Sequence, residues 1–189
     1  MAEPSRRAWL PSTDSAYPDL EAPFFCDPLC PKIAKEPVRS PFLPSLAHDL
    51  TWPSEPELFC ADRALRDRYA SIANNRTARA RVFAPKGLGR RTAVIIHGYL
   101  GGAYWLEERV WPVRRLLREG WNVALFVMPF HGVRRPDNGK HLFPSRDPRF
   151  TNEALRQAVF DIQGLVRALF EEGAPEIGLM GMSLGGYVA

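Results

Sequence analysis

Towards the end of the chain, residues 177–186 read IGLMGMSLGG, an apolar run that leads into the pattern Gly-x-Ser-x-Gly. The run predicts a strand, and the glycines predict a tight turn into a helix. Such a bend projects the hydroxyl of Ser183 out of the fold, because Gly181 and Gly185 carry no side chains that would clash there. Ser183 would also begin a helix, where free backbone N–H groups favour a developing negative charge. The segment therefore indicates a nucleophilic serine at a strand-to-helix bend.

A second motif lies upstream and bears on the same chemistry. Residues 93–102 read AVIIHGYLGG, in which four apolar residues predict a strand buried on both faces, followed by a glycine-rich loop. Taken separately, the first motif would suit a flexible Gly/Ser loop and the second an ordinary connection. Acyl transfer, however, needs two backbone N–H donors for the oxyanion of its intermediate. Together the motifs predict that Tyr99 and Leu184 supply these donors, with His97 and Gly98 in the supporting turn.

Residues 78–189 resemble the N-terminal half of an α/β-hydrolase. The likeness rests on the strand with its His-Gly loop, on residues 128–136 (MPFHGVRRP) after another apolar run, and on the serine bend. The resemblance implies an α/β fold with a mostly parallel, doubly wound sheet and helices on both faces. It also implies a Ser-acid-His triad in that chain order, with Ser183 as nucleophile and no metal or organic cofactor.

Patterns on either side of the motifs predict further strands. Alternation with period two over residues 78–84 indicates an antiparallel or edge strand, and the continuous apolar run 121–128 indicates a central one. Strands that alternate with helices build a parallel sheet, whose reactive groups gather at the carboxyl ends of the strands. We therefore expect His97, His131 and Ser183 to share one edge of the sheet.

Two segments have the apolar periodicity of helices. Residues 105–119 form one pattern, which Pro112 must kink or divide. Residues 152–172 form the other, which Thr151 would cap and Gly173 would end. Both are expected to pack on the sheet.

The chain offers no histidine in the position of a catalytic base. The resemblance places the base and the acid after the serine, and few residues follow Ser183. His97 is expected to stabilise its own turn, and His131 to line the edge of the site with a possible substrate contact. His48 and His141 have no spacing that supports a role. We therefore expect a truncated chain that ends inside a required element and is inactive on its own.

The first 60 residues differ in composition from the rest. Eleven prolines fall there among polar residues, which predicts an extended or partly disordered arm with at most a short strand near residues 49–52. Residues 61–189 would form the N-terminal part of the hydrolase domain, opened by a short helix over 61–72.

Composition bounds the partners and the compartment. The formal charge of +4 comes from arginines scattered along the chain, and pairs such as Arg134 and Arg135 suggest solvated faces, with no nucleic-acid motif beside them. No segment is long and apolar enough to span a membrane. The chain has an odd number of cysteines, Cys26, Cys30 and Cys60, and their spacing is not that of metal ligands. They suggest free thiols and a cytoplasmic location.

These observations predict a serine hydrolase that cleaves a carboxylic ester or related acyl compound through an acyl-enzyme on Ser183. The expected partner is a small-molecule acyl substrate. Two alternatives stay open from the sequence. One is a non-catalytic binding protein with the same fold, and the other is an acyltransferase or peptidase of the same family. The sequence does not specify the substrate or the oligomeric state.

Overall fold

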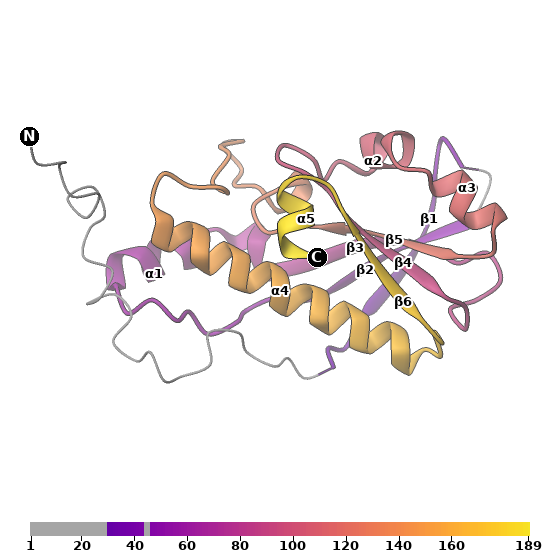
Figure 1. Cartoon of the computed structure of the whole chain (residues 1–189). Helices are drawn as coiled ribbons and strands as arrows, with labels where there is room; N and C mark the ends of the chain where they lie inside the picture. Colours follow the sequence, from indigo (N-terminus) through magenta and orange to yellow (C-terminus); the bar gives the residue numbers. More distant parts are fainter. Residues whose placement is uncertain (1–29, 44–45) are drawn as a thin grey trace, which may run out of the picture.

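A six-stranded mixed sheet forms the centre of the protein (Figure 1). The computed structural model describes residues 30–43 and 46–189. The strands are β1 (Ala34–Arg39), β2 (Leu46–Pro53), β3 (Thr77–Phe83), β4 (Thr92–Ile96), β5 (Asn122–Val127) and β6 (Ile177–Gly181). They are arranged in the order β1-β2-β3-β5-β4-β6.

Only part of this sheet is parallel. Strand β4 runs parallel to its neighbours β5 and β6, whereas β1, β2, β3 and β5 pair with one another in antiparallel fashion. The expected mostly parallel sheet is therefore a mixed one, with its parallel part in β5, β4 and β6. The difference arises because two antiparallel strands come from the proline-rich region, in which the sequence predicts at most a short strand near residues 49–52.

The proline-rich region contributes the strands β1 and β2, of which β2 buries residues on both of its faces. In β2 the side chains of Ala47, Leu50 and Trp52 are buried, while the residues between them are more exposed. Prolines are tolerated there because Pro37 lies in the edge strand β1 and Pro53 ends β2. Residues 34–53 of the region before residue 60 thus belong to the same sheet as β3. The part of the arm before residue 30, Cys26 included, lies outside the described residues.

Helices cover both faces of the sheet (Figure 1). They are α1 (Arg63–Ala70), α2 (Tyr104–Val110), α3 (Val113–Arg118), α4 (Pro148–Glu171) and α5 (Leu184–Val188), with short 3-10 turns η2 (Ala73–Arg76) and η3 (Gly132–Arg134). Ile96 of β4 packs in one core with residues of α4, and the adjacent Ile95 packs in a second core with Val113 of α3. Successive residues of a strand point to opposite faces, so a fully buried strand needs a helix layer on each side.

Two helix boundaries refine the sequence expectations. Pro112 divides the first helical pattern, because it is the residue before α3 rather than a kink within one helix. Helix α4 begins four residues earlier than expected, since Asp147 caps it by accepting from the Arg149 N–H. Thr151 is therefore not the cap, and its hydroxyl bonds the backbone of Ser145 instead. Within the described ranges, no helix is long and apolar enough to cross a membrane.

Candidate active site

Ser183 occupies the bend between β6 and α5. Its φ and ψ of 53° and −117° are unusual for a residue with a side chain, and the residue is exposed. Positive φ at a non-glycine residue costs free energy and persists only where the surrounding structure enforces it. We call residues 181–185 the serine bend. The chain thus passes from β6 through a strained, exposed serine directly into α5.

The glycines of the serine bend allow backbone segments to meet at very short range. A Cβ atom on Gly185 would lie 2.2 Å from the carbonyl oxygen of Ile96, and one on Gly181 would lie 2.3 Å from the oxygen of Gly185. The Met182 N–H also donates to the Ile96 oxygen over 3.2 Å. The start of α5 is thereby pressed against the end of β4.

The glycine-rich loop, residues 98–102, lies beside the serine. A Cβ atom on Gly98 would be 3.5 Å from the Ser183 Cβ atom. Within the part of the chain that the structure describes, neither the Tyr99 N–H nor the Leu184 N–H donates to a protein acceptor. The two loops that meet at Ser183 thus each retain a free backbone donor, which is the requirement for binding an oxyanion.

A buried glutamate holds the far end of the glycine-rich loop. Glu107 of α2 accepts hydrogen bonds from the Gly102 N–H and from the Trp111 side chain, each over 2.8 Å. A Cβ atom on Gly101 would lie 2.8 Å from the same carboxylate, so the loop packs directly on it. Sequence reasoning did not find this residue, because a glutamate in an amphipathic helix has no pattern that distinguishes an anchor from a solvated charge.

His97 links the glycine-rich loop to the end of β5. Its ring is buried, with Nδ1 2.8 Å from the Gly98 oxygen and Nε2 3.1 Å from the Met128 nitrogen. The Met128 N–H is a donor, so Nε2 accepts and the proton of the neutral ring lies on Nδ1. Burial lowers the pKa of His97 to about 4. Both ring nitrogens are therefore occupied, and the ring cannot take the proton of Ser183.

His131 follows β5 and is fully buried. Its Nδ1 atom lies 2.9 Å from the Pro129 oxygen, while Nε2 has no hydrogen-bond partner among the described residues. Burial, followed by the neighbouring His97, lowers the pKa of His131 to about 4. The rings of Tyr99 and Phe143 pack edge-on against it. A substrate could contact His131 only if these covering side chains moved.

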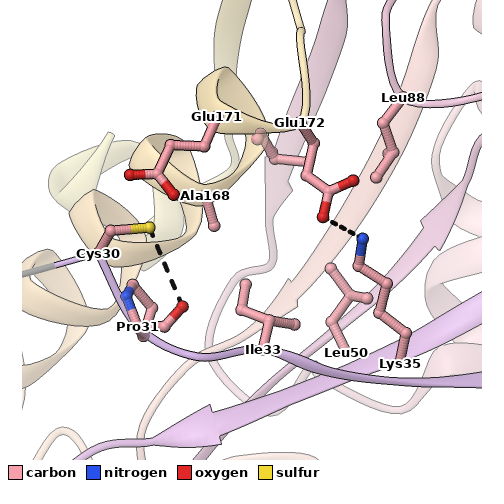
Figure 2. A pocket seen from close by; sticks show the side chains of 10 residues that line it. Cys30, Pro31, Ile33, Lys35, Leu50, Leu88, Ala168, Glu171 and Glu172 are labelled. Carbon is pink, nitrogen blue, oxygen red and sulfur yellow. Dashed lines mark hydrogen bonds and ion pairs between the residues drawn. The ribbon is translucent and has the colours of Figure 1, made fainter.

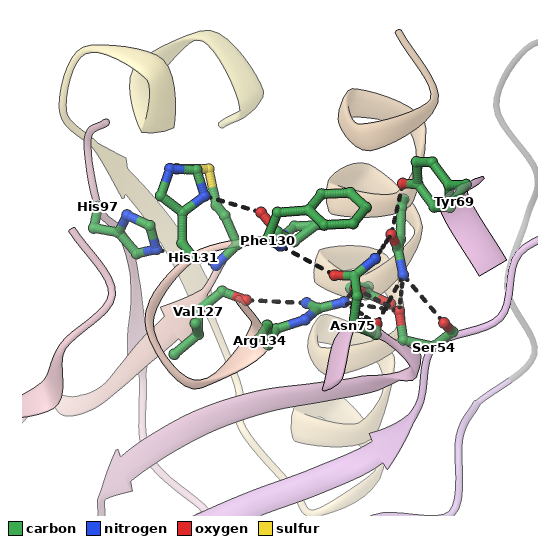
Figure 3. Close-up of polar contacts among 12 residues, drawn as sticks. Ser54, Tyr69, Asn75, His97, Val127, Phe130, His131 and Arg134 are labelled. Atoms are coloured by element: carbon green, nitrogen blue, oxygen red, sulfur yellow. Dashed lines mark hydrogen bonds and ion pairs between the residues drawn. The ribbon is translucent and has the colours of Figure 1, made fainter. Parts of the chain in front are cut away.

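Arg134, drawn with its polar partners in Figure 3, is also fully buried. It lies 2.9 Å from Asp161 of α4 in an ion pair whose two side chains are both inaccessible to solvent. The expected solvated face at Arg134 and Arg135 is therefore wrong for Arg134. An isolated arginine after a strand gives no sign in the sequence of a carboxylate that lies on a helix 27 residues later.

The remaining expectations concern other parts of the molecule. The pocket in Figure 2 lies between the start of β1 and the end of α4 and has a volume of about 220 Å³; none of the predicted site residues lines it. Cys30 at this pocket and the buried Cys60 are free thiols. Among the described residues, no group of three or more His, Cys, Asp or Glu side chains is placed to hold a metal ion.

No protein-family model matches the chain. Two uncharacterized proteins of Mycobacterium tuberculosis, from strains CDC 1551 / Oshkosh and H37Rv, are each 38% identical to it over 101 residues. That match covers 51% of this chain and 24% of each relative. The chain therefore spans about a quarter of the length of the curated relatives it matches.

The solved structures with a similar fold include three described as acetyl xylan esterases. One is a Bacteroides fragilis protein provisionally given that name (TM-score 0.53, 12% identity), and another comes from Thermoanaerobacterium sp. JW/SL YS485 (TM-score 0.50, 18% identity). A third comes from Paenibacillus sp. R4 (TM-score 0.50, 20% identity). The likeness covers 84–85% of this chain and 44–48% of those chains. The chain thus has an α/β fold with a mixed sheet that resembles esterase structures.

Proposed function

We propose that this protein is a serine hydrolase of the α/β-hydrolase type that cleaves a carboxylic ester through an acyl-enzyme on Ser183. The observation that carries the proposal is the position of Ser183, exposed on a strained bend beside a glycine-rich loop. The free Tyr99 and Leu184 N–H groups in the two adjoining loops support it further. Similar folds in acetyl xylan esterases agree with this reaction class, at identities that speak for the fold alone.

In the proposed reaction, the Ser183 Oγ atom attacks the carbonyl carbon of the ester. A general base takes the hydroxyl proton, and the Tyr99 and Leu184 N–H groups donate to the oxyanion that forms. The tetrahedral intermediate then expels the alcohol, which receives the proton, and leaves an acyl group on the serine. Water attacks this acyl-enzyme by the same steps and releases the carboxylic acid.

Neither buried histidine suits the role of the base. His97 uses both ring nitrogens in holding the loops, and His131 has its Nε2 atom enclosed. Both have a pKa lowered to about 4, which makes them weak bases at neutral pH. We therefore propose that a group other than these two rings takes the Ser183 proton, oriented by an acid of its own. The complete protein is the form in which activity should be tested.

An active-site probe tests the proposal on that complete protein. A fluorophosphonate should label the wild-type protein and its Ser71→Ala variant, which loses an exposed hydroxyl far along the chain from the bend. Ser183→Ala should abolish labelling and lower hydrolysis of p-nitrophenyl acetate by about 10³-fold or more. Labelling that survives in Ser183→Ala would remove this serine from its role. A folded wild-type protein that takes no label would instead favour the non-catalytic binding protein.

A further inference from the structure

The loop that follows β5, residues 128–135, is in direct contact with the glycine-rich loop. We call it the β5 loop. The Met128 N–H donates to the His97 ring that bonds Gly98. A Cβ atom on Gly132 would lie 2.2 Å from the Gly102 oxygen, so the two backbones touch without an intervening side chain. A displacement of the β5 loop would therefore be passed to the loop that lies beside Ser183.

The β5 loop does not owe its shape to regular secondary structure alone. Phe130 has a φ of 60°, which is unfavourable for a residue with a side chain, and Gly132 also has positive φ. The Phe130 N–H is held by the Asn75 side-chain oxygen over 3.0 Å. Such a conformation persists only where its surroundings enforce it.

Arg134, itself a residue of the β5 loop, makes further buried contacts (Figure 3). Its Nη1 atom donates to the oxygen of Val127, the last residue of β5, over 3.0 Å. Its Nη2 atom donates over 3.0 Å to the Ser54 hydroxyl and to the Asn75 backbone oxygen. Asp161 of α4 neutralises the guanidinium and also accepts from the Ser54 hydroxyl over 2.8 Å. One side chain thus joins the end of β5 to the chain after β2, to η2 and to α4.

A fully buried ion pair contributes little net free energy to the stability of a core. Removing two charges from water is so unfavourable that apolar residues of similar volume often stabilise a protein equally well or better. Apolar residues, however, could not bond the carbonyl groups of Val127 and Asn75 in fixed directions. The fork of an arginine does so with a rigid geometry. This contrast points to a role in position rather than in stability.

We propose that Arg134 is a positioning residue: held by Asp161, it fixes the β5 loop and through it keeps the glycine-rich loop beside Ser183. Its kinetic consequence rests on the proposed function. The mechanical part, the ordering of the β5 loop, does not depend on any reaction.

An apolar replacement of the pair separates position from stability. In the complete protein, Arg134→Met combined with Asp161→Leu removes both charges and keeps the volume. We expect amide hydrogen exchange at Met128 and Phe130 to become at least about tenfold faster than in the wild type, while core amides of β4 keep their protection. With p-nitrophenyl acetate, kcat should fall about 10- to 100-fold and KM should change less than about twofold, because small misplacements of reacting groups mainly slow the chemical step.

A second buried ion pair on the same helix is the matched control. Arg156 and Glu153 of α4 are 2.8 Å apart and nearly inaccessible, and they bind the segment around Glu57 and Cys60 rather than the β5 loop. Arg156→Met combined with Glu153→Leu should leave kcat and the two amides unchanged. Arg134→Lys is a milder variant that keeps a charge for Asp161 but loses the fork, and it should show smaller changes of the same kind.

The proposal is overturned if the Arg134 and Asp161 double variant exchanges Met128 and Phe130 no faster than the control variant. It is equally overturned if Arg134→Lys leaves both amides protected. Failure of the proposed function gives a different result, because a wild-type protein without esterase activity or Ser183 labelling would still reveal the exchange difference.

Discussion

The serine bend and the β5 loop lie at the same edge of the sheet, but different forces fix their shapes. At the bend, space is decisive, because backbone atoms meet where Gly181 and Gly185 lack side chains. In the β5 loop, polar contacts are decisive, because buried side chains such as Arg134 and Asn75 bond its backbone. A requirement for space selects one residue type at a fixed spacing. A requirement for polar contacts can be met by partners from anywhere in the chain.

The largest expected effect tests the spatial requirement at the bend. In Gly185→Ala the new methyl group would lie 2.2 Å from the Ile96 oxygen and 2.5 Å from the His97 oxygen, and neither backbone atom can turn aside. We expect the free energy of unfolding to fall by more than about 4 kcal/mol, or the bend to open with loss of fluorophosphonate labelling. Urea unfolding and labelling together measure the two outcomes.

The neighbouring glycine is the control. A Cβ atom on Gly186 would approach the Gly181 oxygen only to 3.3 Å, and alanine favours a helix more than glycine does. Gly186→Ala should therefore change the free energy of unfolding by less than about 1 kcal/mol in either direction. Equal losses in the two variants would show that general crowding of α5, rather than the contact with β4, decides the tolerance of the bend.

The same contrast explains what the sequence could predict. The strands β3, β4 and β5 lie within two residues of their expected limits, because burial on one or both faces leaves a periodic pattern. Helix α1 and strand β6 also lie within two residues of theirs, although β6 is only partly buried. The strand–turn–helix path around Ser183 follows in the same way from its glycines. Strand β1 was not predicted, since its residues are mostly exposed and it includes Pro37. An edge strand gains its identity from the neighbour with which it pairs.

The buried contacts of Glu107 and Arg134 could not be predicted from the sequence, for a related reason. Glu107 and Arg134 each look like an ordinary surface charge in the sequence, and nothing near them names the amide or carboxylate that they bond. The partners of Arg134 come from β5, from the chain after β2, from η2 and from α4. Only the folded sheet brings these segments together. Buried polar contacts between distant segments are thus the part of a site that a single sequence hides.

A smaller expected effect is the pH dependence of the free energy of unfolding, which tests the buried polar groups His97 and His131. His97 and His131 have pKa values lowered to about 4, whereas an unfolded chain binds a proton near pH 6.5. Their contribution to stability is therefore complete above about pH 6.5 and is lost as the pH falls towards 4, by roughly 3 kcal/mol for each ring. Urea unfolding at pH 7 and pH 4.5 measures this loss.

Replacing a buried histidine by phenylalanine, which does not titrate, separates the contribution of the histidine to the pH dependence of stability from that of the carboxylates. In His131→Phe, the loss of stability between pH 7 and pH 4.5 should be smaller than in the wild type by about 2 kcal/mol. If His131→Phe loses as much stability as the wild type over this range, the buried ring is not kept neutral by the fold.

The smallest effect concerns the glycine-rich loop, which combines both kinds of support. Its Gly101 needs space against Glu107, and its Gly102 N–H needs the same carboxylate as an acceptor. Glu107→Gln keeps the shape but exchanges one acceptor oxygen for an NH₂ group, which cannot accept from both Gly102 and Trp111. We expect about 1–2 kcal/mol lower stability and a several-fold lower kcat, against no measurable change in Glu119→Gln, whose ion pair with Arg115 is exposed. If the Glu107 variant loses stability while kcat is retained, the loop is held by packing alone, and the polar contact belongs to the helix rather than to the site.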